Sequence, residues 1–288
     1  MNFIQRNFFW LLISLTSLFV WIIRWIPESF IRFYNIVFIS WDYYPRVLVR
    51  GSMYTVAAIG MVSRLLAVLL AMLIIYLVWK GKLSSNSATK FLGTSIVLEG
   101  VYFASLIPSI FYLFALGATR NSLFYSTFGV GYFLQVILTV PFLWFLGISI
   151  YRNKFGYRHF QSYKLLGITF FGYIGALWAN SVFHWFGLML TEGISVLWNS
   201  SSSILAFNTL IVMSLAFIFA FFGGLDISKK RFESKWVGAA LTSVGLHFLI
   251  YLIYQFLTDS LISVWLTDIW AIGLLALGLA ILKSKTSK

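Results

Sequence analysis

The sequence predicts an all-α protein, a polytopic transmembrane helical bundle of about eight spans that forms one membrane domain over residues 1–288. Three observations predict this fold class. Sixty per cent of the 288 residues are hydrophobic and only 10% are charged, whereas a soluble domain carries about 25% charged residues. The apolar residues fall into runs of about 20, the length that crosses roughly 30 Å of hydrocarbon. The 15 Tyr and 12 Trp residues suit the membrane–water boundaries, where these side chains collect.

Eight apolar runs define the predicted spans. They are 8–26, 55–79, 91–116, 128–150, 165–190, 204–224, 236–257 and 261–282. The longest connection, 27–54, mixes charged residues and prolines with aromatic residues, so we expect an interfacial helix near 29–41 in the head-group layer. The first run is followed by bulky Trp25 and Ile26 rather than by a small-residue cleavage site, which favours a retained anchor. If that run does not cross, seven spans remain.

The distribution of basic residues predicts the orientation. Lys and Arg outnumber Asp and Glu by 21 to 8, and basic residues are retained on the cytoplasmic side during insertion. The predicted inner connections and termini hold most of them: Arg6, Lys80, Lys82, Lys90, Arg152, Lys154, Arg158, Lys164, Lys229, Lys230, Arg231, Lys235, Lys283, Lys285 and Lys288. We therefore expect a multi-pass protein of the cell membrane with both termini cytoplasmic. The basic clusters are short and lack the pattern of a nucleic-acid surface, so no nucleic-acid partner is expected.

Arg64 lies on the most informative helix face. Ala57, Gly60, Arg64, Ala67 and Ala71 follow a 3-4-3-4 spacing that places them on one side of a helix. Small residues allow helices to approach closely in membranes. We therefore expect Arg64 to point into the bundle. The alternative is that its side chain extends to the outer boundary, about 13 Å away.

Two carboxylates compete as the partner of Arg64. Asp268 lies about 13 Å below the outer boundary, at the depth of Arg64, whereas Glu99 lies roughly 10 Å deeper. Glu99 shares a helix face with Ser95 and Tyr102. An Arg64–Asp268 pair is therefore the expected pair, with Glu99 as the rival partner, since pairing would relieve two buried charges at once.

Four more polar residues complete the candidate solute or ion path: Asn180, His184, Asn208 and His247. Asn180 and His184 share one helix face, and Gln135 and Gln255 also fall in the outer half. Intramembrane polar residues mark transport paths, so this set predicts a polar chamber in the outer half of the bilayer. A purely structural polar network is the alternative. Pro108 and Pro141 should each bend a span, because proline cannot donate a backbone hydrogen bond.

The leading functional hypothesis is a small-solute or ion transporter, or a channel-like component. One alternative is a redox subunit that binds one b-type haem through His184 and His247, although helix counting places their imidazoles about 6–12 Å apart in depth. The others are an outer-leaflet enzyme acting on a lipid-linked substrate and a structural subunit of a membrane complex. The chain contains no cysteine and no HExxH, GxSxG, P-loop, GxGxxG or CxxC motif, so we predict no catalytic residues and no metal site. The expected partners are the lipid bilayer and, in the subunit interpretation, other membrane subunits.

Overall fold

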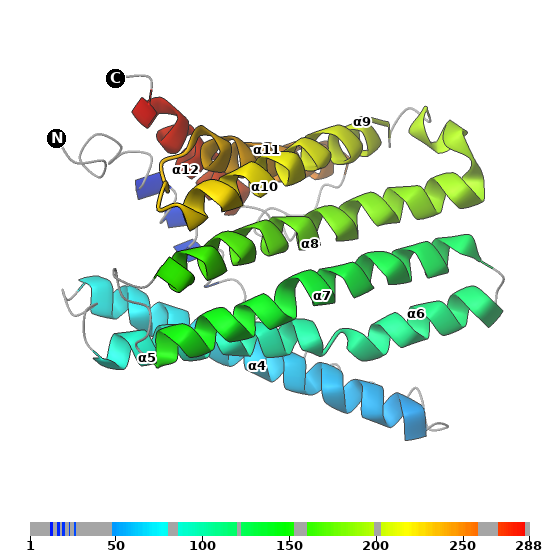
Figure 1. Ribbon diagram of the computed structural model, residues 1–288. Coiled ribbons are helices and arrows are strands. Elements are labelled where there is room, and N and C mark those ends of the chain that lie inside the picture. Colours follow the sequence, from blue (N-terminus) through cyan, green and yellow to red (C-terminus); the bar gives the residue numbers. More distant parts are fainter. Residues whose placement is uncertain are drawn as a thin grey trace.

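The computed structural model describes residues 48–79, 86–119, 122–152, 160–198, 203–258 and 270–285, together with isolated helical positions between 12 and 26. The regular structure of this part of the chain is helical throughout, in rods that lie side by side (Figure 1). The elements are α4 (Leu48–Trp79), α5 (Asn86–Ala104), α6 (Ile107–Thr119), α7 (Leu123–Tyr151), α8 (Phe160–Glu192), η2 (Ile194–Leu197), α9 (Ser203–Phe207), η3 (Asn208–Met213), α10 (Ser214–Ser228), α11 (Lys235–Thr258) and α12 (Trp270–Lys285).

Seven helical segments of the described chain match the second to eighth predicted spans. They are α4, α5 with α6, α7, α8, α9 with η3 and α10, α11, and α12. Within the described residues, four helices are long and apolar enough to cross a membrane: Leu123–Tyr151, Tyr163–Glu192, Ser203–Ser228 and Lys235–Tyr254. Ala58–Ile74 and Ala271–Lys283 are shorter apolar helices. These lengths are compatible with an integral membrane protein, and the all-α prediction is confirmed for the described residues.

The predicted count of about eight spans is not reached within the described residues. The first predicted span, 8–26, lies outside them except for its isolated helical positions, and the interfacial helix expected near 29–41 lies wholly outside them. The second span differs in length. It was expected to begin at 55, but α4 begins at Leu48.

Pro108 interrupts the segment between 86 and 119 as predicted. Helix α5 ends at Ala104, and α6 begins at Ile107 after a two-residue turn. The proline cannot donate to the preceding turn and its ring would clash there. The Ser105 hydroxyl donates to a carbonyl of that turn at 2.6 Å and helps to close the end of α5. Pro141 behaves differently, since α7 continues through it without a break.

The helices pack mainly on their neighbours along the chain. Helix α7 lies between α5 with α6 on one side and α8 on the other, while α10, α11 and α12 continue the row (Figure 1). Large apolar side chains remain on the outside, including Phe111 and Phe145, which are 70% and 65% exposed. A water-soluble surface would not keep such residues exposed in quantity. This exterior is compatible with contact with a lipid bilayer.

Three helix pairs cross through reciprocal glycine contacts, in which each glycine faces the backbone of the other. They are Gly93 with Gly147, Gly167 with Gly224, and Gly238 with Gly278. A Cβ on Gly147 would lie 2.7 Å from the Gly93 carbonyl oxygen, and a Cβ on Gly224 would lie 2.7 Å from that of Gly167. Small residues permit this backbone contact in membrane bundles. All three crossings lie near the end where α5, α8 and α11 begin, which is the end predicted to be cytoplasmic.

Candidate functional site

Helices α4 and α5 form an antiparallel pair whose facing sides carry the candidate site. The Ser95 hydroxyl on α5 donates to the Ala67 carbonyl oxygen on α4 at 2.9 Å. Further along the same contact, a side chain on Gly60 would collide with Ser105. Arg64 lies between these two contact points. The stripe of small residues on α4 is therefore a packed face, as expected from its spacing.

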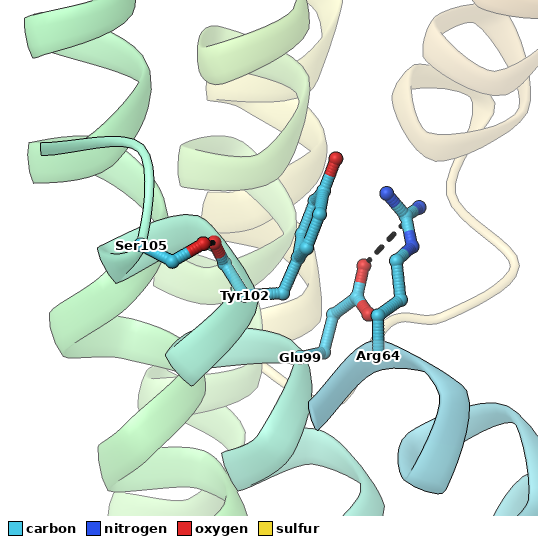
Figure 2. A network of polar contacts seen from close by, with 4 residues as sticks. All are labelled: Arg64, Glu99, Tyr102 and Ser105. Atoms are coloured by element: carbon cyan, nitrogen blue, oxygen red, sulfur yellow. Dashed lines mark hydrogen bonds and ion pairs between the residues drawn. The ribbon is translucent and has the colours of Figure 1, made fainter. Parts of the chain in front are cut away.

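Arg64 and Glu99 form a buried ion pair at this contact. The Arg64 Nη2 and Glu99 Oε1 atoms are 3.5 Å apart, and the two side chains are 9% and 22% exposed (Figure 2). A close charge-assisted hydrogen bond of this kind measures about 2.7–2.9 Å. The two charges therefore attract each other without a tight, two-pronged hydrogen-bonded fit.

Tyr102 supports the guanidinium from one side. The Arg64 Cζ atom lies 4.1 Å from the centroid of the Tyr102 ring, within the range of a cation–π interaction. Figure 2 shows the Tyr102 ring and the guanidinium side by side, with the Glu99 carboxyl at the base of the group. Because Tyr102 follows Glu99 by three residues, one helix face supplies both contacts.

Two more phenols approach this group from other helices. Tyr173 of α8 interacts electrostatically with Glu99, Arg64 and Tyr102, and Tyr132 of α7 interacts with Tyr102. The Tyr173 ring packs edge-on against Phe103, with the ring centroids 6.2 Å apart. The site therefore takes residues from four helices. An apolar cluster packs against the three tyrosines: Phe103, Ile110, Val136, Val140 and Leu143.

Among the described residues, the carboxylate beside Arg64 is Glu99, which the sequence ranked second. The expected partner, Asp268, lies outside the described residues. Helix α4 begins seven residues before the predicted second span, and α5 begins at Asn86, five residues before the predicted third span. Counted from the α4–α5 connection, Arg64 and Glu99 lie about 22 Å and 20 Å along their helices. Arg64 is thus at the middle of α4.

Asn208 and His247 form a second buried polar contact, between η3 and α11. The Asn208 side-chain amide donates to the His247 carbonyl oxygen at 3.1 Å, and the two residues are 6% and 3% exposed. Asn208 Oδ1 and His247 Nδ1 have no hydrogen-bond partner among the described residues. Asn208 begins a π-helical turn, an element that is frequent at functional sites.

His184 and Asn180 lie elsewhere, on α8. The His184 ring packs edge-on against Phe124 and Phe128 of α7, with centroid distances of 5.6 Å and 5.3 Å. The Asn180 Oδ1 atom is buried without a hydrogen-bond partner, as is Gln135 Oε1. The contacts of the described residues join Arg64 with Glu99 and Asn208 with His247. They do not join these pairs to each other or to His184.

The two histidines suggested as haem ligands have different aromatic neighbours. His184 contacts Phe124 and Phe128 of α7 through its ring, whereas the His247 ring packs on Phe248 of its own helix, with the centroids 4.8 Å apart. A b-type haem between them remains a prediction from the sequence. The described residues contain no cluster of three or more His, Cys, Asp or Glu side chains suited to a metal ion. The Gln255 side chain lies outside the described set.

Sequence reasoning missed Tyr132 and Tyr173 as members of the site. A signal for Tyr173 was present, because it lies seven residues before Asn180 on the same face of α8. Tyrosines are common in this chain, with 15 in all, so residue type alone did not distinguish these two. Only the packing of α7 and α8 against α5 places them near the ion pair.

The chain matches no family model, no curated protein and no solved structure. Its function must therefore be argued from the apolar helices and from the chemistry of the buried ion pair.

Proposed function

We propose that this chain is an integral membrane transporter of small charged solutes, with the Arg64–Glu99 pair at its solute site. The observation that carries the proposal is a charged pair at the midpoint of α4, enclosed by helices whose outer surfaces are apolar. Ionisable residues inside membrane bundles mark solute and ion paths. In this proposal the protein lies in the cell membrane with both termini in the cytoplasm.

The geometry of the pair favours a solute site over a structural one. A buried ion pair gives little net stability, because removing two charges from water costs about as much as their attraction returns. The 3.5 Å separation leaves this pair without a tight hydrogen-bonded fit. The adjacent Tyr102 and Tyr173 supply hydroxyl groups that donate or accept hydrogen bonds.

Flux into liposomes tests the proposal. The purified chain would be reconstituted and supplied with labelled chloride, nitrate, phosphate, lactate, glutamate, lysine or choline. We expect at least one of these solutes to enter faster than it enters protein-free liposomes. Arg64→Gln and Glu99→Gln should each abolish or strongly reduce that entry.

Matched controls separate the site from general charge effects. Arg152→Gln and Glu192→Gln make the same chemical changes at exposed positions of α7 and α8, and both should transport like the unmodified chain. Entry equal to that of protein-free liposomes for the whole panel contradicts the transport proposal. So does entry that is unchanged in Arg64→Gln.

A further inference from the structure

We propose that the turn between α10 and α11 forms a surface that binds the headgroups of anionic phospholipids. The surface consists of five exposed side chains: Lys229, Lys230, Arg231, Phe232 and Lys235. It does not involve the proposed solute site. The inference starts from two features of the turn, which are a group of cations on a fixed backbone and an exposed phenylalanine among them.

The turn carries an excess of positive charge. Four of the seven residues from 229 to 235 are basic, and Lys164, at the start of α8, adds another exposed cation nearby in the fold. The acidic residues of the segment 226–235 are Asp226 and Glu233. The Asp226 carboxyl accepts a hydrogen bond from the Ser234 hydroxyl. Clusters of basic residues at the cytoplasmic end of membrane helices attract anionic lipids, and this turn lies at the end predicted to be cytoplasmic.

Hydrogen bonds fix the turn at both ends. At the end of α10, the Lys230 N–H donates to the Ile227 carbonyl oxygen at 2.8 Å, and the Arg231 N–H donates to that of Asp226 at 2.9 Å. This pair of bonds is a Schellman motif. At the start of α11, the Ser234 hydroxyl oxygen accepts from the Trp236 N–H at 3.2 Å, as a helix N-cap does. A backbone ordered in advance loses less entropy when a headgroup binds.

Lys230 occupies a backbone position that favours glycine. Its φ angle is 63°, in the left-handed region that usually holds glycine at the end of a helix. A lysine there keeps a cation on the turn in an unfavourable backbone conformation. Its ammonium lies 5.1 Å from the centroid of the Tyr163 ring on α8. The turn is therefore joined to a third helix through this side chain.

Phe232 distinguishes a lipid from a soluble anion. Its side chain is 42% exposed, although it stands between charged Arg231 and Glu233. The ring packs on Tyr163, with the centroids 5.5 Å apart, so it is held on the surface beside the cations. An aromatic side chain among basic ones suits the boundary between headgroups and acyl chains. A soluble phosphate compound would leave this ring in water.

Trp236 places the turn at the membrane boundary. Its ring packs on that of Phe222 of α10, with the centroids 5.1 Å apart, and the Lys235 ammonium lies 4.9 Å from the Trp236 ring centroid. Phe222 is itself 42% exposed, on the apolar exterior of α10. Tryptophan collects at the level of the headgroups. Lys235 and its neighbours in the turn are therefore at the depth of lipid phosphates.

Thermal melting and native mass spectrometry test the inference. The purified chain in a neutral detergent would be supplied with phosphatidylglycerol, phosphatidylserine or phosphatidylcholine. We expect both anionic lipids to raise the Tm and to stay bound in the mass spectrum more than phosphatidylcholine does, because a ligand of the folded state stabilises it. Glycerol 3-phosphate, a phosphate without acyl chains, should leave the Tm unchanged at the same concentration.

Variants locate the binding surface. Each basic side chain near an anionic surface contributes about fivefold in affinity, so Lys229→Gln combined with Arg231→Gln should weaken phosphatidylglycerol binding by about 25-fold. Lys90→Gln combined with Arg152→Gln is the matched control. It removes two exposed cations from the same end of the molecule, on α5 and at the end of α7, and should bind phosphatidylglycerol like the unmodified chain. Phe232→Ser should weaken the binding of phosphatidylglycerol while keeping every cation.

The outcomes are distinct. Equal effects of phosphatidylglycerol and phosphatidylcholine on the unmodified chain overturn the inference, whether or not the variants fold. Equal losses in the two double variants show a general effect of charge and overturn the assignment to this turn. A Tm rise with glycerol 3-phosphate as large as that with phosphatidylglycerol indicates a soluble phosphate compound and overturns the lipid assignment. Solute entry into liposomes is a separate measurement, so the proposed function and this inference can fail independently.

Discussion

The Arg64–Glu99 pair gives the most specific prediction for stability. The perturbation is a double-mutant cycle of Arg64→Gln, Glu99→Gln and the combined variant, in which glutamine removes each charge but keeps a polar side chain. At a separation of 3.5 Å, Coulomb's law with an effective dielectric constant near 20 gives an attraction of about 5 kcal/mol. The cost of removing both charges from water offsets most of this attraction in the intact protein.

The single variants should therefore lose much more stability than the double variant. Each single change leaves one buried charge without its partner, which typically costs about 3–5 kcal/mol. The partial exposure of Glu99 places this chain at the lower end of that range. The double change removes both charges and should cost far less than the two single losses together, so the coupling between the sites should reach about 3 kcal/mol.

Thermal melting in a mild detergent measures the cycle. In a chain of this size 1 kcal/mol corresponds to a shift of about 2–4 °C in the Tm, so each single variant should melt roughly 6–12 °C lower. The combined variant should recover most of that loss. If the Tm shift of the combined variant equals the sum of the two single shifts, the pairing of Arg64 with Glu99 is refuted.

Three further predictions follow from the packing and the charge distribution. Gly245→Ala should lower the Tm by several degrees, because its Cβ would lie 2.8 Å from the Leu275 Cα atom and forced overpacking costs about 1–3 kcal/mol. Leu246→Ala, on the exposed side of α11, is the control. An equal shift of the Tm in both variants would contradict the close crossing of α11 and α12. Tyr102→Phe keeps the ring beside the guanidinium but removes the hydroxyl that hydrogen-bonds to Arg64, so it should lower the Tm less than Tyr102→Ala, which also loses about 1–2 kcal/mol of cation–π attraction. Similar melting of the Phe and Ala variants would argue against the cation–π contact. Because the chain has no cysteine, the variant Lys230→Cys carries a single reactive thiol. That thiol should react with a membrane-impermeant reagent only after the cells are opened, and labelling in intact cells would contradict the predicted orientation.

The sequence predicted the faces of the helices better than their relative positions. The spacing of Gly60, Arg64 and Ala67 identified a packed face on α4, and the spacing of Ser95 and Glu99 identified one on α5. Both faces are used, since Ser95 bonds to Ala67 and Glu99 pairs with Arg64. Side-chain periodicity along a helix is a local property, which a single sequence reveals.

The estimated depths of the residues did not show that these faces of α4 and α5 lie against each other. The expected difference in depth between Arg64 and Glu99 depended on where the third span begins. That span was expected to begin at 91, whereas α5 begins at Asn86, and five residues move a side chain by about 7.5 Å along the axis. With the helix ends at Trp79 and Asn86, Arg64 and Glu99 lie at similar distances from the α4–α5 connection.

The sequence did not predict that α7 and α8 contribute residues to the site, for a different reason. Tyr132 and Tyr173 reach the site only because α7 packs on α5 and α8 packs on α7. Glycine contacts such as that between Gly93 and Gly147 set the approach of α5 and α7. The chain contains 21 glycines, and their pairing across helices is a tertiary property that no spacing along one helix specifies.

The most direct test of the central claim is solute entry into liposomes that contain the chain. The liposomes would be supplied with labelled chloride, nitrate, phosphate, lactate, glutamate, lysine or choline, with the membrane potential clamped at zero by potassium and valinomycin. We expect one or more of these solutes to enter faster than into protein-free liposomes, with Arg152→Gln behaving like the unmodified chain and Arg64→Gln losing that entry. Entry that persists in Arg64→Gln, or entry no faster than into protein-free liposomes, would contradict a solute site at the Arg64–Glu99 pair.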